Sequence, residues 1–159
     1  MRRTALLLGA MLAALVAVSA VAWAVTTVYC SNPKNVEGGT CHGTVGDDYV
    51  IGTDKREEIA ANTGDDVVRG GRGTNEINTD YADSSIDYGN DVIYGGPGGD
   101  SLGGSLEADR YYGGGGDDTL GDYYHGDPDV FRCGPGYDRV DYNRGDKVAA
   151  DCEELHRVR

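Results

Sequence analysis

Carboxylates recur along this chain at a nine-residue spacing, and each follows a segment rich in glycine. Counted from Gly43, with a two-residue phase slip before Asp91 and a two-residue insertion before Asp129, the sixth position of the repeat is Asp in eight of eleven units. Glycine tolerates positive φ, and a short carboxylate adds charge to converging carbonyl oxygens, which are the ligands that Ca²⁺ takes. The sixth-position residues are Asp48, Glu57, Asp66, Asn75, Ser84, Asp91, Asp100, Asp109, Asp118, Asp129 and Asp138.

Apolar residues recur with the same period, two places after each carboxylate position. Alternate residues of a strand point to one face, so these residues are expected to point inward to a narrow core. The carboxylate pattern and the apolar pattern keep the same period over eleven units, which indicates an ordered repeat rather than a disordered acidic chain. The eighth-position residues are Val50, Ile59, Val68, Ile77, Ile86, Ile93, Leu102, Tyr111, Leu120, Phe131 and Val140.

A sequence resemblance predicts the turns and strands that position these residues. The segments GGPGGDSLG (95–103) and GGGGDDTLG (113–121) match in full the pattern G-G-x-G-x-D-x-U-x, where U is apolar. This pattern resembles the RTX, or hemolysin-type, calcium-binding nonapeptide. The resemblance covers about Gly43 to Asp141. It implies an all-β fold, a parallel β-roll, in which six residues form a turn, three form a strand and two units make one coil.

The same resemblance implies several calcium ions between stacked turns, where units one coil apart meet. Partners are then expected 18 residues apart, with sites centred on Asp48 and Asp66, on Asp100 and Asp118, and on Asp118 and Asp138. Unit counting predicts that calcium is concentrated along one edge of the roll. The defective fifth unit and the phase slip before Asp91 predict an irregular bulge or loop. The expected metal-site residues are Gly43, Gly46, Asp48, Gly64, Asp66, Asp91, Gly95, Gly96, Gly98, Asp100, Asp109, Gly113, Gly114, Gly116, Asp118, Gly136 and Asp138.

The N-terminal segment has the pattern of a signal peptide. Arg2 and Arg3 precede an apolar run, and Ala22, Trp23 and Ala24 form an A-x-A site, so residues 1–24 are expected to be cleaved after Ala24. The alternative is an uncleaved N-terminal anchor. Both interpretations place the rest of the chain outside the cell, as a secreted or surface-associated protein without membrane insertion after cleavage.

Export permits disulfide bonds, and the four cysteines fall as two local pairs. Three connectivities are possible, and we favour Cys30 with Cys41 and Cys133 with Cys152 because a regular repeat would hold the two pairs far apart. Neither spacing suits a zinc site. We expect an N-terminal cap at 25–42, the roll at 43–141 and a C-terminal cap at 142–159, although the end segments could also be merely oxidised tails.

Composition and motifs limit the functions that this chain can have. The formal net charge of −13 argues against nucleic acid and anionic membrane as partners. No HExxH motif is present, and no catalytic residue is predicted. The favoured function is a secreted, non-catalytic repeat protein that folds on binding extracellular Ca²⁺, since its carboxylates repel one another without it.

Two other functions stay open. One is a cell-surface adhesion or matrix module that binds cell-wall or extracellular polysaccharide by stacking sugars on its tyrosines. The other is a small hydrolase. The tyrosines expected at outward or loop positions are Tyr81, Tyr88, Tyr94, Tyr112, Tyr123 and Tyr124.

Overall fold

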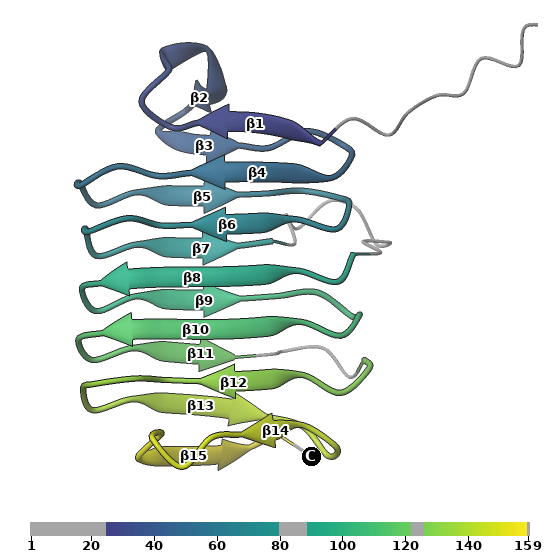
Figure 1. Ribbon diagram of the computed structural model, residues 1–159, viewed down its shortest axis with the longest axis vertical. Helices are drawn as coiled ribbons and strands as arrows, with labels where there is room; N and C mark the ends of the chain where they lie inside the picture. The colour runs from purple at the N-terminus through teal and green to yellow at the C-terminus, as the bar shows by residue number, and fades with distance from the viewer. Residues whose placement is uncertain (1–24, 80–88, 122–125, 159) are drawn as a thin grey trace, which may run out of the picture.

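The chain winds into a parallel β-roll of two facing sheets, as the computed structural model shows for residues 25–79, 89–121 and 126–158 (Figure 1). Sheet A has seven strands, in the spatial order β1 (Thr26–Tyr29), β4 (Asp48–Ile51), β6 (Val67–Arg69), β8 (Val92–Pro97), β10 (Arg110–Gly115), β12 (Val130–Arg132) and β14 (Lys147–Val148). Sheet B has eight, in the order β15 (Glu154–Arg157), β13 (Arg139–Tyr142), β11 (Thr119–Gly121), β9 (Ser101–Gly103), β7 (Glu76–Asn78), β5 (Glu58–Ala60), β3 (Thr40–His42) and β2 (Val36–Glu37).

Successive strands alternate between the two sheets, so each pair of nonapeptides makes one coil. Neighbouring strands are parallel, except that β2 pairs antiparallel with β3. The helical content of the described residues is one 3₁₀ turn, η1 (Pro33–Asn35), and no helix there has the length and apolarity to cross a membrane. The predicted all-β roll is confirmed. The predicted signal peptide, residues 1–24, lies outside the described residues.

The core consists of two rows of the residues predicted to point inward, one row from each sheet. Of the eleven eighth-position residues, ten are buried, and Ile86 lies outside the described residues. The rings of Tyr111 and Phe131 stack inside, with centroids 4.6 Å apart. Val148 continues the row of sheet A as a partly buried residue opposite Phe131. The period-two pattern of the strands therefore sets the core, because each three-residue strand points its central side chain inward.

Coil length varies at two places. Val50 pairs with Val68 and Ile59 with Ile77, which are 18-residue steps, whereas Val68 pairs with Ile93 across 25 residues. The extra residues include the segment 80–88, which lies outside the described residues, and β8 pairs directly with β6. A smaller lengthening, 20 residues, separates Tyr111 from Phe131 around segment 122–125.

This insertion corrects one prediction. Unit counting put the best repeats on a single edge of the roll. The structure instead places Asp48 and Asp66 at the entrance to sheet A, and Asp100, Asp118 and Asp138 at the entrance to sheet B. The prediction is wrong because the fifth unit was counted as a half-coil, and skipping it exchanges the edges of all later units.

Both ends of the roll are closed by a disulfide bond. Cys30 is bonded to Cys41 at one end and Cys133 to Cys152 at the other, which confirms the local pairing. The end segments add further turns to the roll, because their strands join the two sheets. β1 pairs with β4, β3 with β5, β12 with β14 and β13 with β15. The sheets therefore extend beyond the nonapeptide repeats in both directions.

Candidate metal sites

Turns stack along two edges of the roll, and both edges carry carboxylates. Edge A comprises the turns that enter the strands of sheet A, and edge B those that enter sheet B (right and left in Figure 1, respectively). Of the predicted metal-site residues, those on edge A are Gly43, Gly46, Asp48, Gly64, Asp66, Asp91 and Asp109. Those on edge B are Gly95, Gly96, Gly98, Asp100, Gly113, Gly114, Gly116, Asp118, Gly136 and Asp138.

One oxygen of each stacked carboxylate joins two coils. On edge B, the backbone N–H of Asp100 donates to Oδ1 of Asp118 at 2.8 Å, and that of Asp118 donates to Oδ1 of Asp138 at 2.8 Å. On edge A, the N–H of Asp48 donates to Oδ1 of Asp66 at 2.8 Å, and the same bond links Asp91 to Asp109 at 2.9 Å. The expected partners are therefore brought together, each carboxylate accepting from the coil before it.

The second oxygen of the edge B carboxylates is buried, as it also is for Asp66, Asp91 and Asp129 on edge A. Oδ2 of Asp100, of Asp118 and of Asp138 is buried and has no hydrogen-bond partner among the described residues. These side chains are at most 3% exposed. A buried carboxylate oxygen without a partner costs free energy unless a cation or donor reaches it. The three edge B residues thus form a row of buried acceptors spaced one coil apart.

Glycines leave room around these oxygens. A Cβ on Gly95 would stand 2.5 Å from Oδ2 of Asp100, and one on Gly113 would clash with Oδ2 of Asp118. Gly96 and Gly114 each have φ of +115°, and a Cβ on Gly114 would also collide with the carbonyl oxygen of Gly96 in the stacked turn. Side chains are therefore excluded from the space that the carboxylate and the turn carbonyls share.

Burial makes the stacked carboxylates hard to ionise. The pKa of Asp118 is raised to about 7, first by burial and then by the charges of Asp100, Asp138 and Asp117, against a hydrogen bond that lowers it. Burial also raises the pKa of Asp100 and of Asp138. On edge A, burial and the charge of Asp91 raise the pKa of Asp109 to about 7. A divalent cation would relieve both desolvation and mutual repulsion.

In three turns, hydrogen-bond donors of the turn itself bond to its carboxylate. In the turn that begins Gly43-Thr44, the Thr44 hydroxyl donates to Oδ1 of Asp48 at 3.1 Å and its N–H to Oδ2. The Thr53 hydroxyl donates to Oε1 of Glu57 at 2.7 Å. These two threonines stand where the fully matching repeats have a second glycine.

The third such turn begins Gly104-Ser105 on edge A. The N–H of Ser105 donates to Oδ2 of Asp109 at 2.9 Å, and the Tyr111 hydroxyl approaches the same oxygen at 3.3 Å. Sequence reasoning missed Thr44, Thr53 and Ser105 as partners of the carboxylates. The signal that identifies them is a hydroxyl residue in the second position of the turn.

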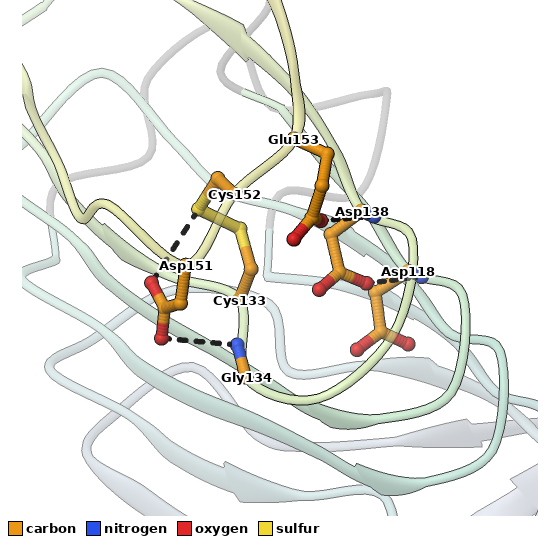
Figure 2. The surroundings of a disulfide bond; sticks show 7 residues. All are labelled: Asp118, Cys133, Gly134, Asp138, Asp151, Cys152 and Glu153. Carbon is orange, nitrogen blue, oxygen red and sulfur yellow. Dashed lines mark hydrogen bonds between the residues drawn. A yellow bond between two sulfur atoms is a disulfide. The ribbon is translucent and has the colours of Figure 1, made fainter.

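The carboxylate rows continue into the C-terminal segment, where the sequence motif fades. Oε2 of Glu153 accepts from the N–H of Asp138 at 2.9 Å, and Figure 2 shows Glu153, Asp138 and Asp118 in one line beside the disulfide. Asp151, next to Cys152, accepts from the N–H of Gly134 at 3.2 Å. On edge A, Oδ1 of Asp146 accepts from Asp129 at 3.0 Å. Glu153 and Asp146 were missed because their spacing departs from nine.

The donor set fits Ca²⁺. No group of three or more His, Cys, Asp or Glu side chains lies close enough to hold a metal in the described part of the chain. A bound ion would therefore take one or two carboxylates together with backbone carbonyls of the glycine turns, an all-oxygen set that a hard cation accepts. Buried oxygens without a partner and spaces cleared by glycine meet that requirement on edge B.

A parallel β-roll with acidic, glycine-rich turns stacked on both edges defines a class of calcium-binding repeat proteins. The model of the RTX calcium-binding nonapeptide repeat matches four copies here, within residues 42–77 and 86–120. The chain therefore carries RTX calcium-binding nonapeptide repeats, as the resemblance implied. No match was found among curated proteins or among solved structures.

Proposed function

We propose that this protein is an exported, non-catalytic module whose roll is ordered by extracellular Ca²⁺. The observation that carries the proposal is the row of Asp100, Asp118 and Asp138 on edge B, whose Oδ2 atoms are buried without a hydrogen-bond partner. Calcium would supply the missing positive charge, and these three residues with the glycine turns would hold it. Because unfolded chain offers no such stack, binding free energy becomes folding free energy.

Occupancy should differ between turns. Fully matching Gly-Gly turns on edge B leave a carboxylate oxygen for the ion, whereas the Gly-Thr turns before Asp48 and Glu57 already hydrogen-bond both carboxylate oxygens. We expect edge B between Asp100 and Asp138 to bind calcium most tightly. On edge A, Asp48 and Asp109 should bind calcium more weakly, because their Oδ2 atoms already accept hydrogen bonds from Thr44 and Ser105.

Calcium titration calorimetry of the purified protein tests the site assignment. Replacing the three edge B aspartates with asparagine should weaken the tightest calcium binding by at least tenfold, since each Asn keeps shape but not charge. A matched variant carries the same change of charge on exposed residues of sheet B: Glu58→Gln, Glu76→Gln and Glu154→Gln. Equal losses in both variants would reduce the effect to overall charge and reject the site.

Export is supported by the two disulfide bonds, which form and persist outside the reducing cytosol. The proposed signal peptide, residues 1–24, is tested by N-terminal sequencing of the protein recovered from the medium. Cleavage after Ala24 gives a first residue of Val25. An N-terminus upstream of the apolar run, with the protein retained in the membrane fraction, supports the alternative of an uncleaved anchor.

A second candidate function is adhesion to extracellular polysaccharide. The observation that favours it is a cationic, tyrosine-bearing outer face on sheet A, which an otherwise acidic protein does not need for solubility. The simple form of that idea, sugars stacked on tyrosine rings, does not suit Tyr94 and Tyr112. Their rings stack on each other, with centroids 4.7 Å apart and planes 12° from parallel.

A further inference from the structure

Charge is segregated between the outer faces of the two sheets. The residues flanking the inward position in β4, β6, β8, β10, β12 and β14 form the outer face of sheet A. In the described strands this face has no Asp or Glu, although the chain has 27 acidic residues. Its exposed cations are Arg69, Arg110, Arg132 and Lys147. The outer face of sheet B instead carries Glu58, Glu76, Asp141 and Glu154, with Arg139 paired to Asp141.

Four side chains of sheet A form a continuous stack across four neighbouring strands. The Arg69 guanidinium lies over the Tyr94 ring at 4.6 Å, Tyr94 stacks on Tyr112, and the Arg132 guanidinium lies over Tyr112 at 5.7 Å. Register explains the order, because Arg69 pairs with Tyr94, Tyr94 with Tyr112, and Tyr112 with Arg132. We call these four residues the Arg-Tyr row.

Stacking determines which atoms of this row remain available to a ligand. Each ring has one face against the other ring and one against a guanidinium, so ring edges and guanidinium edges are what the row presents. A guanidinium carries its N–H donors in its own plane, so stacking leaves them directed outward, where they match a carboxylate or sulfate. Arg69 Nε donates to the Tyr49 hydroxyl at 2.6 Å, which fixes that side chain.

Neither arginine of the row has a carboxylate partner. Within the described residues, the ion pairs involve Asp141 with Arg139 and with His156, and none involves Arg69 or Arg132. Strands lie about 4.8 Å apart, so the row extends roughly 14 Å, the length of a few sugar rings in an extended chain. A hollow of about 310 Å³ continues it from Arg69 and Tyr94 toward edge B, where Arg72 adds a further cation.

We infer that the outer face of sheet A binds an extracellular anionic polysaccharide of the uronate type. The guanidinium groups of Arg69 and Arg132, three strands apart, suit carboxylates that recur along a sugar chain. The aliphatic residues Val67, Val92 and Val130 beside the row suit the apolar faces of sugar rings. Duplex DNA is a poorer occupant. It carries about one charge per 1.7 Å, a density that the two guanidinium groups of the Arg-Tyr row, three strands apart, do not match.

This inference rests on the proposed function, because calcium on the two edges would neutralise the carboxylates that flank the cationic face. Polysaccharide binding should therefore need calcium. The probe is hyaluronate, a uronate polymer that calcium does not gel, with dextran as the neutral polymer. Duplex DNA and phosphatidylglycerol vesicles are the competing anions. Affinities are measured on the purified protein with and without calcium, and calcium-dependent circular dichroism is recorded on the same samples.

The face variant replaces Arg69, Arg110 and Arg132 with serine. The control variant makes the same change of charge at exposed arginines outside the face: Arg56→Ser, Arg144→Ser and Arg157→Ser. We expect the parent to bind hyaluronate with calcium and not dextran, the face variant to bind at least tenfold more weakly, and the control to stay within threefold of the parent. The face variant should keep the calcium-dependent β signal.

Three results would overturn the inference. They are no hyaluronate binding by the calcium-loaded parent, equal losses in the two variants, or tighter binding of DNA or vesicles than of hyaluronate. The dichroism separates this failure from that of the proposed function. A normal calcium response without hyaluronate binding rejects only the polysaccharide face, whereas no calcium response rejects the calcium-ordered roll itself.

Discussion

At the scale of single residues, the two oxygens of one carboxylate have different roles. Oδ1 of Asp118 accepts a backbone N–H from the coil before it, which any folded state of the roll requires. Oδ2 of the same residue is buried and has no hydrogen-bond partner among the described residues. A hydrogen bond between coils and a metal ligand can therefore come from one side chain, and substitution by asparagine separates them.

Asp118→Asn should weaken calcium binding at this position by at least tenfold, about 1.4 kcal/mol, because the amide keeps one neutral oxygen and loses the charge. The same change should raise the residual β signal of the calcium-free protein, since a buried, repelled charge disappears. Calorimetry and circular dichroism of the chelated protein measure the two effects. Asp127→Asn, at an exposed turn residue, should alter neither, and weaker binding in that control would contradict the assignment.

Raised pKa values predict an unusual pH dependence. Burial raises the pKa of Asp109 and of Asp118 to about 7, above the value of about 3.9 in unfolded chain. Between about pH 4 and pH 7 the folded state therefore binds more protons, so the free energy of unfolding falls as pH rises and levels off above about 7.

The measurement is the β signal of the calcium-free protein by circular dichroism at pH 5 and pH 7.5, with the higher signal expected at pH 5. Saturating calcium should remove or reverse the difference, because the ion stabilises the ionised carboxylates. The double variant Asp109→Asn with Asp118→Asn should lessen it without calcium. A higher β signal of the calcium-free parent at pH 7.5 would show that these carboxylates are not the dominant titrating groups.

At the scale of elements, a strand of three residues has one inward side chain, so each coil contributes little to the core. Phe131→Ala removes a fully buried ring that stacks on Tyr111 at 4.6 Å. We expect a loss of about 3–5 kcal/mol in the calcium-loaded protein and a higher calcium concentration for folding. Leu155→Ala, at a half-exposed residue of β15, is the control and should cost much less.

The sequence predicted these elements well because each depends on local spacing alone. The inward position of each described strand within the repeat follows from the nine-residue period, as Val50 and Val140 show at either end of the repeat. The assignment of edges failed because it depends on whether the fifth unit forms a half-coil. The assignment is decided by the pairing of Val68 with Ile93 across 25 residues, which the nonapeptide pattern does not predict.

Contacts that decide the candidate site were predicted only in part. The stacking of Asp100 on Asp118 follows from period and topology. The hydrogen bonds of Thr44, Thr53 and Ser105 to carboxylates depend on turn geometry, and the role of Glu153 depends on a spacing outside the repeat. Residue type at the second turn position now provides a rule for separating the two kinds of turn.

At the scale of the whole molecule, the roll has two open ends that need closure, because unpaired strand edges promote association. The Cys133–Cys152 bond holds the segment that brings Glu153 onto the carboxylate row of edge B (Figure 2). Because its cysteines are 19 positions apart in the sequence, this bond should contribute about 3 kcal/mol through the entropy of the unfolded chain.

The double variant Cys133→Ser with Cys152→Ser should therefore lose about that much stability in calcium, and it should need more calcium to fold. Urea denaturation and a calcium titration measure these effects. Cys30→Ser with Cys41→Ser is the comparison, since it opens the other end, away from Glu153. An unchanged calcium midpoint in the C-terminal variant would show that the bond does not support the last carboxylate position.

The central claim is that calcium orders the roll, and a far-ultraviolet circular dichroism titration tests it most directly. The purified protein, with disulfide bonds intact, is titrated with calcium from a chelated start, and magnesium is the control. The account predicts a cooperative rise of β signal with calcium and not with magnesium. Full β signal in the chelated protein, or a chain that stays unfolded at saturating calcium, would contradict it.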